Sequence, residues 1–153
     1  MSHAPAISNQ TITLPDTGAS LALGGRLAAH LKPGDVVALH GDLGAGKTTL
    51  VRGLLQALLG AAVEVPSPTY TLVQIYDTDI GEVWHGDMYR LEQPKDGEEL
   101  GLWDAFEDAI CLIEWPDKLG GFWPRDALSI TLGFDGEGRV ATLTGQRDWI
   151  KHV

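Results

Sequence analysis

A glycine-rich segment at residues 41–48 carries the clearest chemical signal in the sequence. It reads GDLGAGKT and fits the phosphate-loop pattern G-x-x-x-x-G-K-[ST] in full. Gly44 and Gly46 let the backbone curl until several N–H groups face one anion, a conformation that a side chain would hinder. A helix that begins near Lys47 would point its N-terminal N–H groups at the same anion. The segment therefore predicts a binding site for a nucleoside triphosphate.

The two residues that close this motif have separate roles. Lys47 would reach the β- and γ-phosphates as a point charge, and the Thr48 hydroxyl would help to coordinate Mg²⁺. A chance match is the competing interpretation in a chain with 19 glycines. The context opposes it, because the apolar run 36–39 suits a buried strand before the motif and Lys47–Leu59 is an amphipathic helix after it. Gly60 is the expected cap of that helix.

A triphosphate site of this kind also needs a carboxylate that holds Mg²⁺, usually at the C-terminal end of a neighbouring buried strand. Glu114 follows the apolar run 110–113 and is one candidate, with an ordinary solvated acid as the alternative. Asp87 is the other, with a salt bridge to Arg90 as the alternative. His85 shares a strand face with Asp87. No third metal ligand has convincing spacing, so an orienting or structural histidine is the prediction. Which acid touches Mg²⁺ directly stays open.

Three further residues near these motifs have two interpretations each. Thr69, in the proline-stiffened loop 67–69, could sense the γ-phosphate as a switch residue or could simply form a turn. Trp115 is either an exposed contact residue or part of the core. Cys111 lies within the apolar run and is predicted to be a buried apolar filler.

The base of the nucleotide is predicted by exclusion. GTPases of this class recognise guanine through an N-K-x-D segment. The only asparagine in the chain, Asn9, lies near the N-terminus and is not part of such a segment. ATP is therefore the expected ligand, together with Mg²⁺.

The elements around these residues indicate one α/β domain over residues 1–153. Strand-like runs lie at 10–14, 36–39, 70–77, 82–88, 109–113, 128–134 and 139–143. Asp16 or Thr17 should cap a helix that Pro33 ends, and 98–108 is weakly helical. The predicted fold has three layers of the P-loop NTPase type. A mixed, mostly parallel sheet is flanked by helices, and an antiparallel hairpin turns at residues 135–138 near the C-terminus.

The charge balance restricts the partners. The chain has 21 acidic and 11 basic residues, a formal net charge of −10, which argues against autonomous binding to DNA or RNA. Its single cysteine excludes an intrachain disulfide and a cysteine-based zinc site. No apolar stretch approaches the roughly 18 residues of a membrane span, and residues 1–10 lack the pattern of a signal peptide. We therefore expect a cytoplasmic protein without a membrane partner.

Five motif blocks in order give the sequence a family resemblance. They are GDLGAGKTT at 41–49, RG at 52–53, SPTYTLV at 67–73, HGDMYRL at 85–91 and IEWP at 113–116. From about Leu14 to Leu132 the chain resembles the TsaE family, the small P-loop ATPases of bacterial tRNA threonylcarbamoyladenosine synthesis. Many families share the first block, whereas the later blocks together are specific to this one.

The resemblance implies roles for individual residues. Lys47 would bind phosphate, Thr48 and Glu114 would hold Mg²⁺, and Asp87 would assist hydrolysis or metal binding. Thr69 would lie in a switch-like segment, with Trp115 beside the site. Thr17 and Arg139 are candidates for contacts on the adenine side. The implied catalytic set is Lys47, Thr69, Asp87 and Glu114, and the implied cofactor-binding set is Gly41, Asp42, Gly44, Ala45, Gly46, Lys47, Thr48, Thr49, Thr17 and Arg139.

The resemblance also implies partners. TsaE proteins work with TsaB and TsaD. TsaD transfers a threonylcarbamoyl group to an adenosine in tRNA, and TsaC makes the activated donor of that group. The nucleotide state of TsaE would control the TsaB–TsaD complex, so tRNA would be reached indirectly and hydrolysis by the isolated chain would be slow. Two alternatives stay open. One is a P-loop kinase of a small metabolite, although such kinases usually carry an arginine-bearing lid and the six arginines here are scattered. The other is a binding module with nucleotide as a scaffold.

Overall fold

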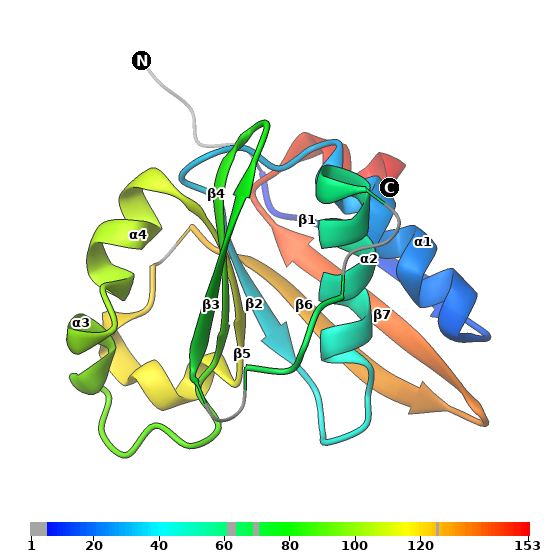
Figure 1. Cartoon of the computed structure of the whole chain (residues 1–153). Coiled ribbons are helices and arrows are strands. Elements are labelled where there is room, and N and C mark those ends of the chain that lie inside the picture. Colours follow the sequence, from blue (N-terminus) through cyan, green and yellow to red (C-terminus); the bar gives the residue numbers. More distant parts are fainter. Residues whose placement is uncertain (1–5, 61–63, 69–70, 125) are drawn as a thin grey trace.

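Seven strands form a single sheet among the residues that the structure describes (Figure 1). These are residues 6–60, 64–68, 71–124 and 126–153 of a computed structural model. The strands are β1 (Ser8–Leu14), β2 (Val36–His40), β3 (Val73–Thr78), β4 (Gly81–Asp87), β5 (Ile110–Glu114), β6 (Leu128–Asp135) and β7 (Gly138–Gly145). The α-helices are α1 (Thr17–Ala28), α2 (Lys47–Leu59), α3 (Asp96–Glu99) and α4 (Leu102–Asp108), and the 3₁₀ helices are η1 (Pro116–Phe122) and η2 (Asp148–His152).

Parallel pairing is confined to the centre of the sheet. The order is β1-β7-β6-β2-β5-β4-β3, with β6, β2, β5 and β4 parallel and the outer pairs antiparallel. The mixed sheet and the C-terminal hairpin are confirmed, although parallel pairs are three of the six rather than most of them. Because parallel strands end at the same edge of a sheet, the ends of β2, β4 and β5 meet there.

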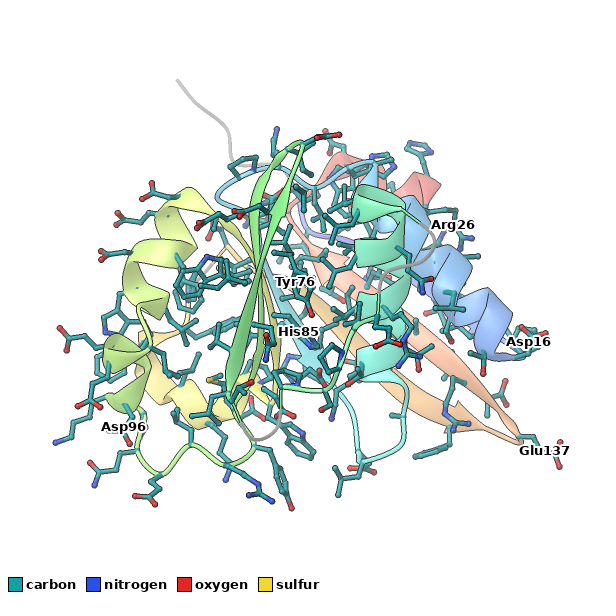
Figure 2. All side chains as sticks on the ribbon, viewed as in Figure 1. Asp16, Arg26, Tyr76, His85, Asp96 and Glu137 are labelled. Atoms are coloured by element: carbon teal, nitrogen blue, oxygen red, sulfur yellow. The ribbon has the colours of Figure 1, made fainter. Side chains whose placement is uncertain are left out.

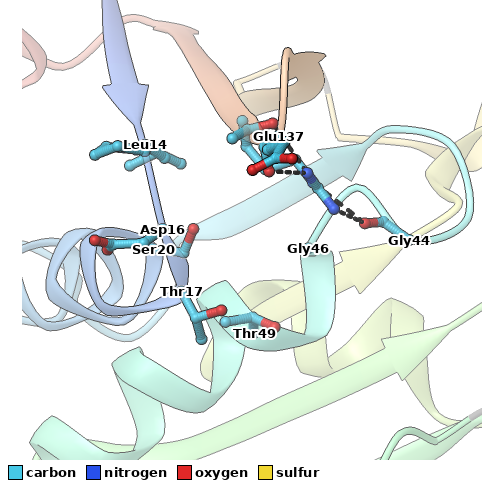
Figure 3. A pocket seen from close by; sticks show the side chains of 11 residues that line it. Leu14, Asp16, Thr17, Ser20, Gly44, Gly46, Thr49 and Glu137 are labelled. Atoms are coloured by element: carbon cyan, nitrogen blue, oxygen red, sulfur yellow. Dashed lines mark hydrogen bonds between the residues drawn. The ribbon is translucent and has the colours of Figure 1, made fainter.

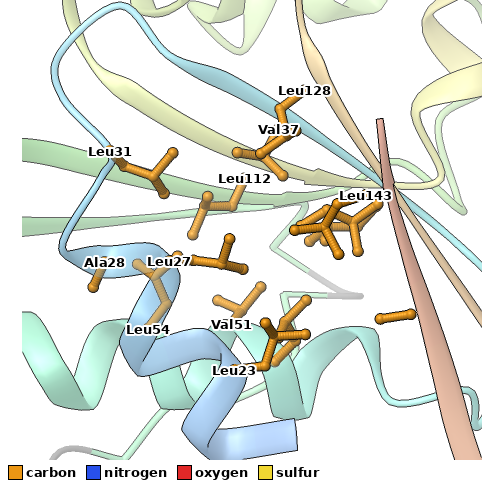
Figure 4. Packing of buried hydrophobic residues seen from close by; sticks show 14 of the residues in the cluster. Leu23, Leu27, Ala28, Leu31, Val37, Val51, Leu54, Leu112, Leu128 and Leu143 are labelled. Atoms are coloured by element: carbon orange, nitrogen blue, oxygen red, sulfur yellow. The ribbon is translucent and has the colours of Figure 1, made fainter. Parts of the chain in front are cut away.

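Helices cover both faces of the sheet, which confirms the predicted three layers. Figure 1 shows α1 and α2 on one face, and α3, α4 and η1 on the other. A buried apolar cluster fills each interface. Figure 4 shows part of the first, in which Leu27 of α1 and Leu54 of α2 lie against Val37 and Leu112 of the sheet. The second includes Met88, Leu102 and Ile113.

The predicted start of α1 and both predicted ends of α2 are present on this first face, whereas α1 ends at Ala28, before Pro33. The Asp16 side chain accepts a hydrogen bond from the Ala19 N–H at 2.8 Å, so Asp16 is the N-cap of α1. Helix α2 has the predicted bounds, and the Gly60 N–H caps it by donating to the Gln56 carbonyl at 2.8 Å. None of the described helices combines the length and apolar character that crossing a membrane requires.

Other elements differ from the sequence-based expectations. The weakly helical stretch 98–108 is divided between α3 and α4, because Gly101 takes a left-handed φ of 82°. Glu114, expected just beyond a strand, is the last residue of β5 and lies in register with Asp87 of β4. The helices η1 and η2 were not predicted, because such short 3₁₀ segments have no apolar periodicity of their own.

Cys111 of β5 is fully buried, as predicted, and burial raises the pKa of its thiol to about 12. At pH 8 roughly one thiol in ten thousand would be ionised, and the thiolate is the reactive form. We expect the native protein to resist a thiol-specific reagent at pH 8 and the urea-unfolded protein to react at once. Rapid stoichiometric labelling of the native protein would contradict the burial of this side chain.

Candidate nucleotide-binding site

The phosphate loop connects β2 to α2 and takes the backbone shape that its glycines predict. Gly44 and Gly46 have φ values of 83° and 102°, in the left-handed region. A Cβ on either would meet no atom within 4 Å, so it is the conformation and not the space that favours glycine. Gly46 begins α2 without a side-chain cap. The first N–H groups of α2 are therefore available to an anion.

Lys47 lies folded against this loop. Its side chain is 5% exposed, and its Nζ donates to the Gly41 carbonyl and lies 3.9 Å from the centre of the Trp115 ring. Burial lowers the pKa of Lys47 below its ordinary value, against the opposing effect of the carboxylates of Glu114, Asp87 and Asp42. The ammonium group is thus partly desolvated and close to negatively charged carboxylates. It could interact with a phosphate in the same way.

The two predicted acids and Thr48 line one cavity beside the loop. The Thr48 hydroxyl donates to the Glu114 carboxylate, at 3.1 Å to Oε2 and 3.3 Å to Oε1. Asp87 is 5% exposed, and its Oδ1 accepts from the Tyr89 N–H at 3.0 Å. A cavity of about 260 Å³ joins these groups, and its lining residues are Leu43, Gly44, Gly46, Lys47, Thr48, Thr49, Ser67, Asp87, Glu114 and Trp115. The structure therefore brings Lys47, Thr48, Asp87 and Glu114 together, with Trp115 at the rim.

A second cavity, of about 340 Å³, lies on the other side of the loop. Figure 3 shows it between the start of α1 and the β6–β7 hairpin. Both adenine-side candidates line it, Thr17 from α1 and Arg139 from β7. The Arg139 guanidinium donates to the Gly44 carbonyl at 3.0 and 3.3 Å and stacks on the Phe134 ring, with Cζ 4.5 Å from its centre. Arg139 thus connects the hairpin to the phosphate loop.

Several residues that line this second cavity were not identified as site residues from the sequence. They are Leu14, Pro15, Asp16, Ser20, Glu137 and Gly138. Asp16 was identified only as a helix cap, and the others carry no local motif. They meet because β1 pairs with β7, which places Leu14 in register with Arg139. Thr49 lines both cavities.

Some predicted site residues have a different status. Gly41, Asp42 and Ala45 line neither cavity, and Ala45 is buried in the first apolar cluster. For these three residues, contacts between the backbone N–H groups and phosphate stay a prediction. Thr69 lies outside the described residues, although Ser67 of the same loop lines the smaller cavity.

The oxygen atoms of Thr48 and Glu114 are suitable ligands for Mg²⁺. A hydroxyl and a carboxylate, from Thr48 and Glu114, present oxygen atoms side by side, and Mg²⁺ in phosphate sites takes few protein ligands and completes its shell with phosphate and water. Within the described parts of the chain, no group of three or more His, Cys, Asp or Glu side chains could hold a metal alone. His85 contacts Glu114 in the interior, as an orienting histidine would.

Comparison with known proteins gives a consistent result. The family described as "Threonylcarbamoyl adenosine biosynthesis protein TsaE" matches residues 14–141. A TsaE protein of Haemophilus influenzae is 38% identical over 146 residues, which are 92% of this chain and 92% of the relative. A TsaE protein of Bacillus subtilis is 39% identical over 124 residues, 78% of this chain and 77% of that one.

A solved structure agrees with these sequence matches. The crystal structure of YdiB from Bacillus subtilis superimposes with a TM-score of 0.77 and 28% identity, covering 99% of this chain and 93% of YdiB. The sequence match extends from the end of β1 into β7 and so includes the phosphate loop, both acids and Arg139. The chain therefore belongs to the TsaE family of tRNA threonylcarbamoyladenosine biosynthesis proteins.

Proposed function

We propose that this protein is an ATPase that binds ATP with Mg²⁺, hydrolyses it slowly alone, and controls a TsaB–TsaD complex through its nucleotide state. One observation carries this proposal: the two cavities share the phosphate loop. Gly44, Gly46 and Thr49 line both of them. A nucleoside in the larger cavity would therefore send its phosphates across the loop toward Lys47 and the acids.

The residues of the smaller cavity would divide the work on the γ-phosphate. Lys47 exchanges the Gly41 carbonyl for phosphate oxygens and neutralises their charge. Thr48 and Glu114 would hold Mg²⁺, which would supply positive charge beside the phosphates. Asp87, in register with Glu114, lines the same cavity and would orient the attacking water.

The proposed rate without partners follows from the cations available. Lys47 is the cation that lines the smaller cavity among the described residues. An arginine finger supplied in trans is worth roughly 10³–10⁵ in rate in related phosphoryl transfers. We infer that such a contribution comes from the partner complex, so that hydrolysis occurs when the complex is assembled. The net charge of −10 agrees with a protein that reaches tRNA through partners. Among the residues that the structure describes, no arginine lines the smaller cavity, so nothing there favours a metabolite kinase.

The test measures ATP turnover by the chain alone, with TsaB, with TsaD and with both. We expect turnover to rise at least about tenfold only with both, since a group in trans must complete the site. The same mixtures, supplied with the activated donor and tRNA, should form threonylcarbamoyladenosine repeatedly only when ATP can be hydrolysed. Equal turnover with and without partners would contradict control by the complex. Full support of many cycles by a non-hydrolysable ATP analogue would instead favour a binding module.

A further inference from the structure

His85 occupies a core position that the proposed chemistry does not use. It lies on β4 between Val83 and Asp87 on one strand face, and it is fully buried. Figure 2 shows it in the interior of the molecule, whereas Asp16 and Glu137 lie at the periphery. His85 does not line the smaller cavity. An apolar residue would fill such a position at lower desolvation cost, so the imidazole calls for a polar explanation.

That explanation is a short contact with Glu114. The His85 Nε2 lies 2.6 Å from Glu114 Oε2, and the two side chains are 0% and 4% exposed. Thr48 donates to the same carboxylate from the direction of the phosphate loop. The Glu114 carboxylate therefore lies between a hydroxyl on the cavity side and an imidazole on the core side. Its rotation is restricted from both directions.

The other ring nitrogen shows which atom carries the proton. Nδ1 of His85 is buried and has no hydrogen-bond partner within the described chain. A proton on Nδ1 would be a buried donor without an acceptor, which is more costly than a bare lone pair at that position. We therefore assign the N–H to Nε2, from which it would donate to Glu114.

We propose that His85 is a positioning residue for the metal site: it fixes the Glu114 carboxylate so that Glu114 and Thr48 present their oxygens to Mg²⁺ together. This inference rests on the proposed ATPase function. It assigns His85 no contact with nucleotide, water or metal. Hydrogen bonds from a second layer of residues to a metal ligand are typically worth 10–100-fold in metal affinity.

Two amide substitutions separate positioning from packing. In His85→Gln the amide nitrogen falls near the place of Nε2 and can still donate to Glu114. In His85→Asn the shorter amide falls near the place of Nδ1 and cannot reach. Both remove the ring, so both lose a similar amount of packing. His85→Leu, which fills the core without a donor, replaces the Asn variant if that variant does not fold.

The experiment measures ATP binding to the full chain by calorimetry, in EDTA and over a Mg²⁺ titration. For His85→Asn we expect the Mg²⁺ concentration at half-effect to rise about 10–100-fold, with ATP affinity in EDTA changed less than about twofold because Lys47 and the loop remain. His85→Gln should recover most of the Mg²⁺ response. In a Glu114→Gln background, His85→Asn should add little, since the two residues act as one unit.

Each other outcome has a defined meaning. If the Asn and Gln variants lose thermal stability equally and show no selective change in Mg²⁺ response, His85 is a packing residue and the inference is wrong. If the effects of His85→Asn and Glu114→Gln add independently, His85 does not act through Glu114. If the unsubstituted protein binds ATP equally with and without Mg²⁺, the metal site of the proposed function fails first.

Discussion

Replacing Lys47 by methionine should sharply lower ATP turnover and weaken ATP binding. Methionine has about the length of the apolar stem of Lys47, a residue that is 5% exposed, and lacks the ammonium group. A preorganised donor aimed at developing charge is typically worth 10²–10³ in turnover. We therefore expect roughly that loss when turnover is measured with TsaB and TsaD present, and a clear rise in the Kd for ATP by calorimetry.

The fold itself should not suffer from this change. Burial lowers the pKa of Lys47, so the folded state disfavours the charged form. The cost is fully present at neutral pH, declines as the pH rises through the lowered pKa of the folded state, and disappears above the ordinary pKa of the unfolded lysine, where the side chain is neutral in both states. Relief of this cost opposes the loss of the contacts with Gly41 and Trp115, so the ligand-free Lys47→Met protein should differ little from the original in urea unfolding at pH 7. Lys95→Met, at the exposed start of α3, is the matched control and should leave binding and turnover unchanged. Unaltered turnover in the Lys47 variant would refute the site assignment.

The phosphate side of the site could be predicted because its signals are local. Strand, loop and helix follow one another within residues 36–60, and each is specified by neighbouring residues. The segments that form β4 and β5 were identifiable, the first as a strand-like run at 82–88 that contains Asp87 and the second as an apolar run just before Glu114. Since parallel strands end at one edge of a sheet, the meeting of these acids with the loop followed from general rules.

The lining of the larger cavity could not be predicted from local patterns. Leu14, Ser20 and Glu137 are ordinary residues of a strand end, a helix and a turn. They share a cavity because β1 joins the far end of the sheet beside β7, a pairing between segments more than 100 residues apart. A single sequence contains no periodicity that specifies such a long-range pair. Thr17 and Arg139 came from the family resemblance, and both line this cavity.

The contact between His85 and Glu114 also could not be predicted from the sequence. Strand periodicity placed His85 on the face of Asp87, and the apolar run placed Glu114 at a strand end. The hydrogen bond between them depends on the exact register of β4 and β5, which pairs His85 with Leu112 and Asp87 with Glu114. A shift of one residue would turn one of the side chains to the opposite face.

A strong effect on stability is expected where α1 crosses α2. A Cβ built on Gly24 would lie 2.3 Å from the Leu50 carbonyl oxygen and 2.7 Å from the Leu54 nitrogen. Both are backbone atoms inside a helix and cannot turn aside, so Gly24→Ala must push the helices apart and open the cluster in which Leu23 and Leu27 pack. We expect a loss of about 3 kcal/mol in urea unfolding, or roughly 10 °C in Tm for a domain of this size.

The neighbouring Gly25 is the matched control in the same helix. A Cβ there would meet only the Ala57 Cβ, at 3.9 Å, which is ordinary contact. Gly25→Ala should therefore gain about 0.5–1 kcal/mol from the better helix propensity of alanine. Equal effects of the two substitutions would show that α1 and α2 do not approach as closely as described. Since α1 begins at Thr17 in the larger cavity and α2 begins at Lys47 in the smaller one, the crossing at Gly24 also sets the distance between the two cavities. The Gly24→Ala protein, where it stays folded, should bind ATP more weakly than the Gly25→Ala protein does.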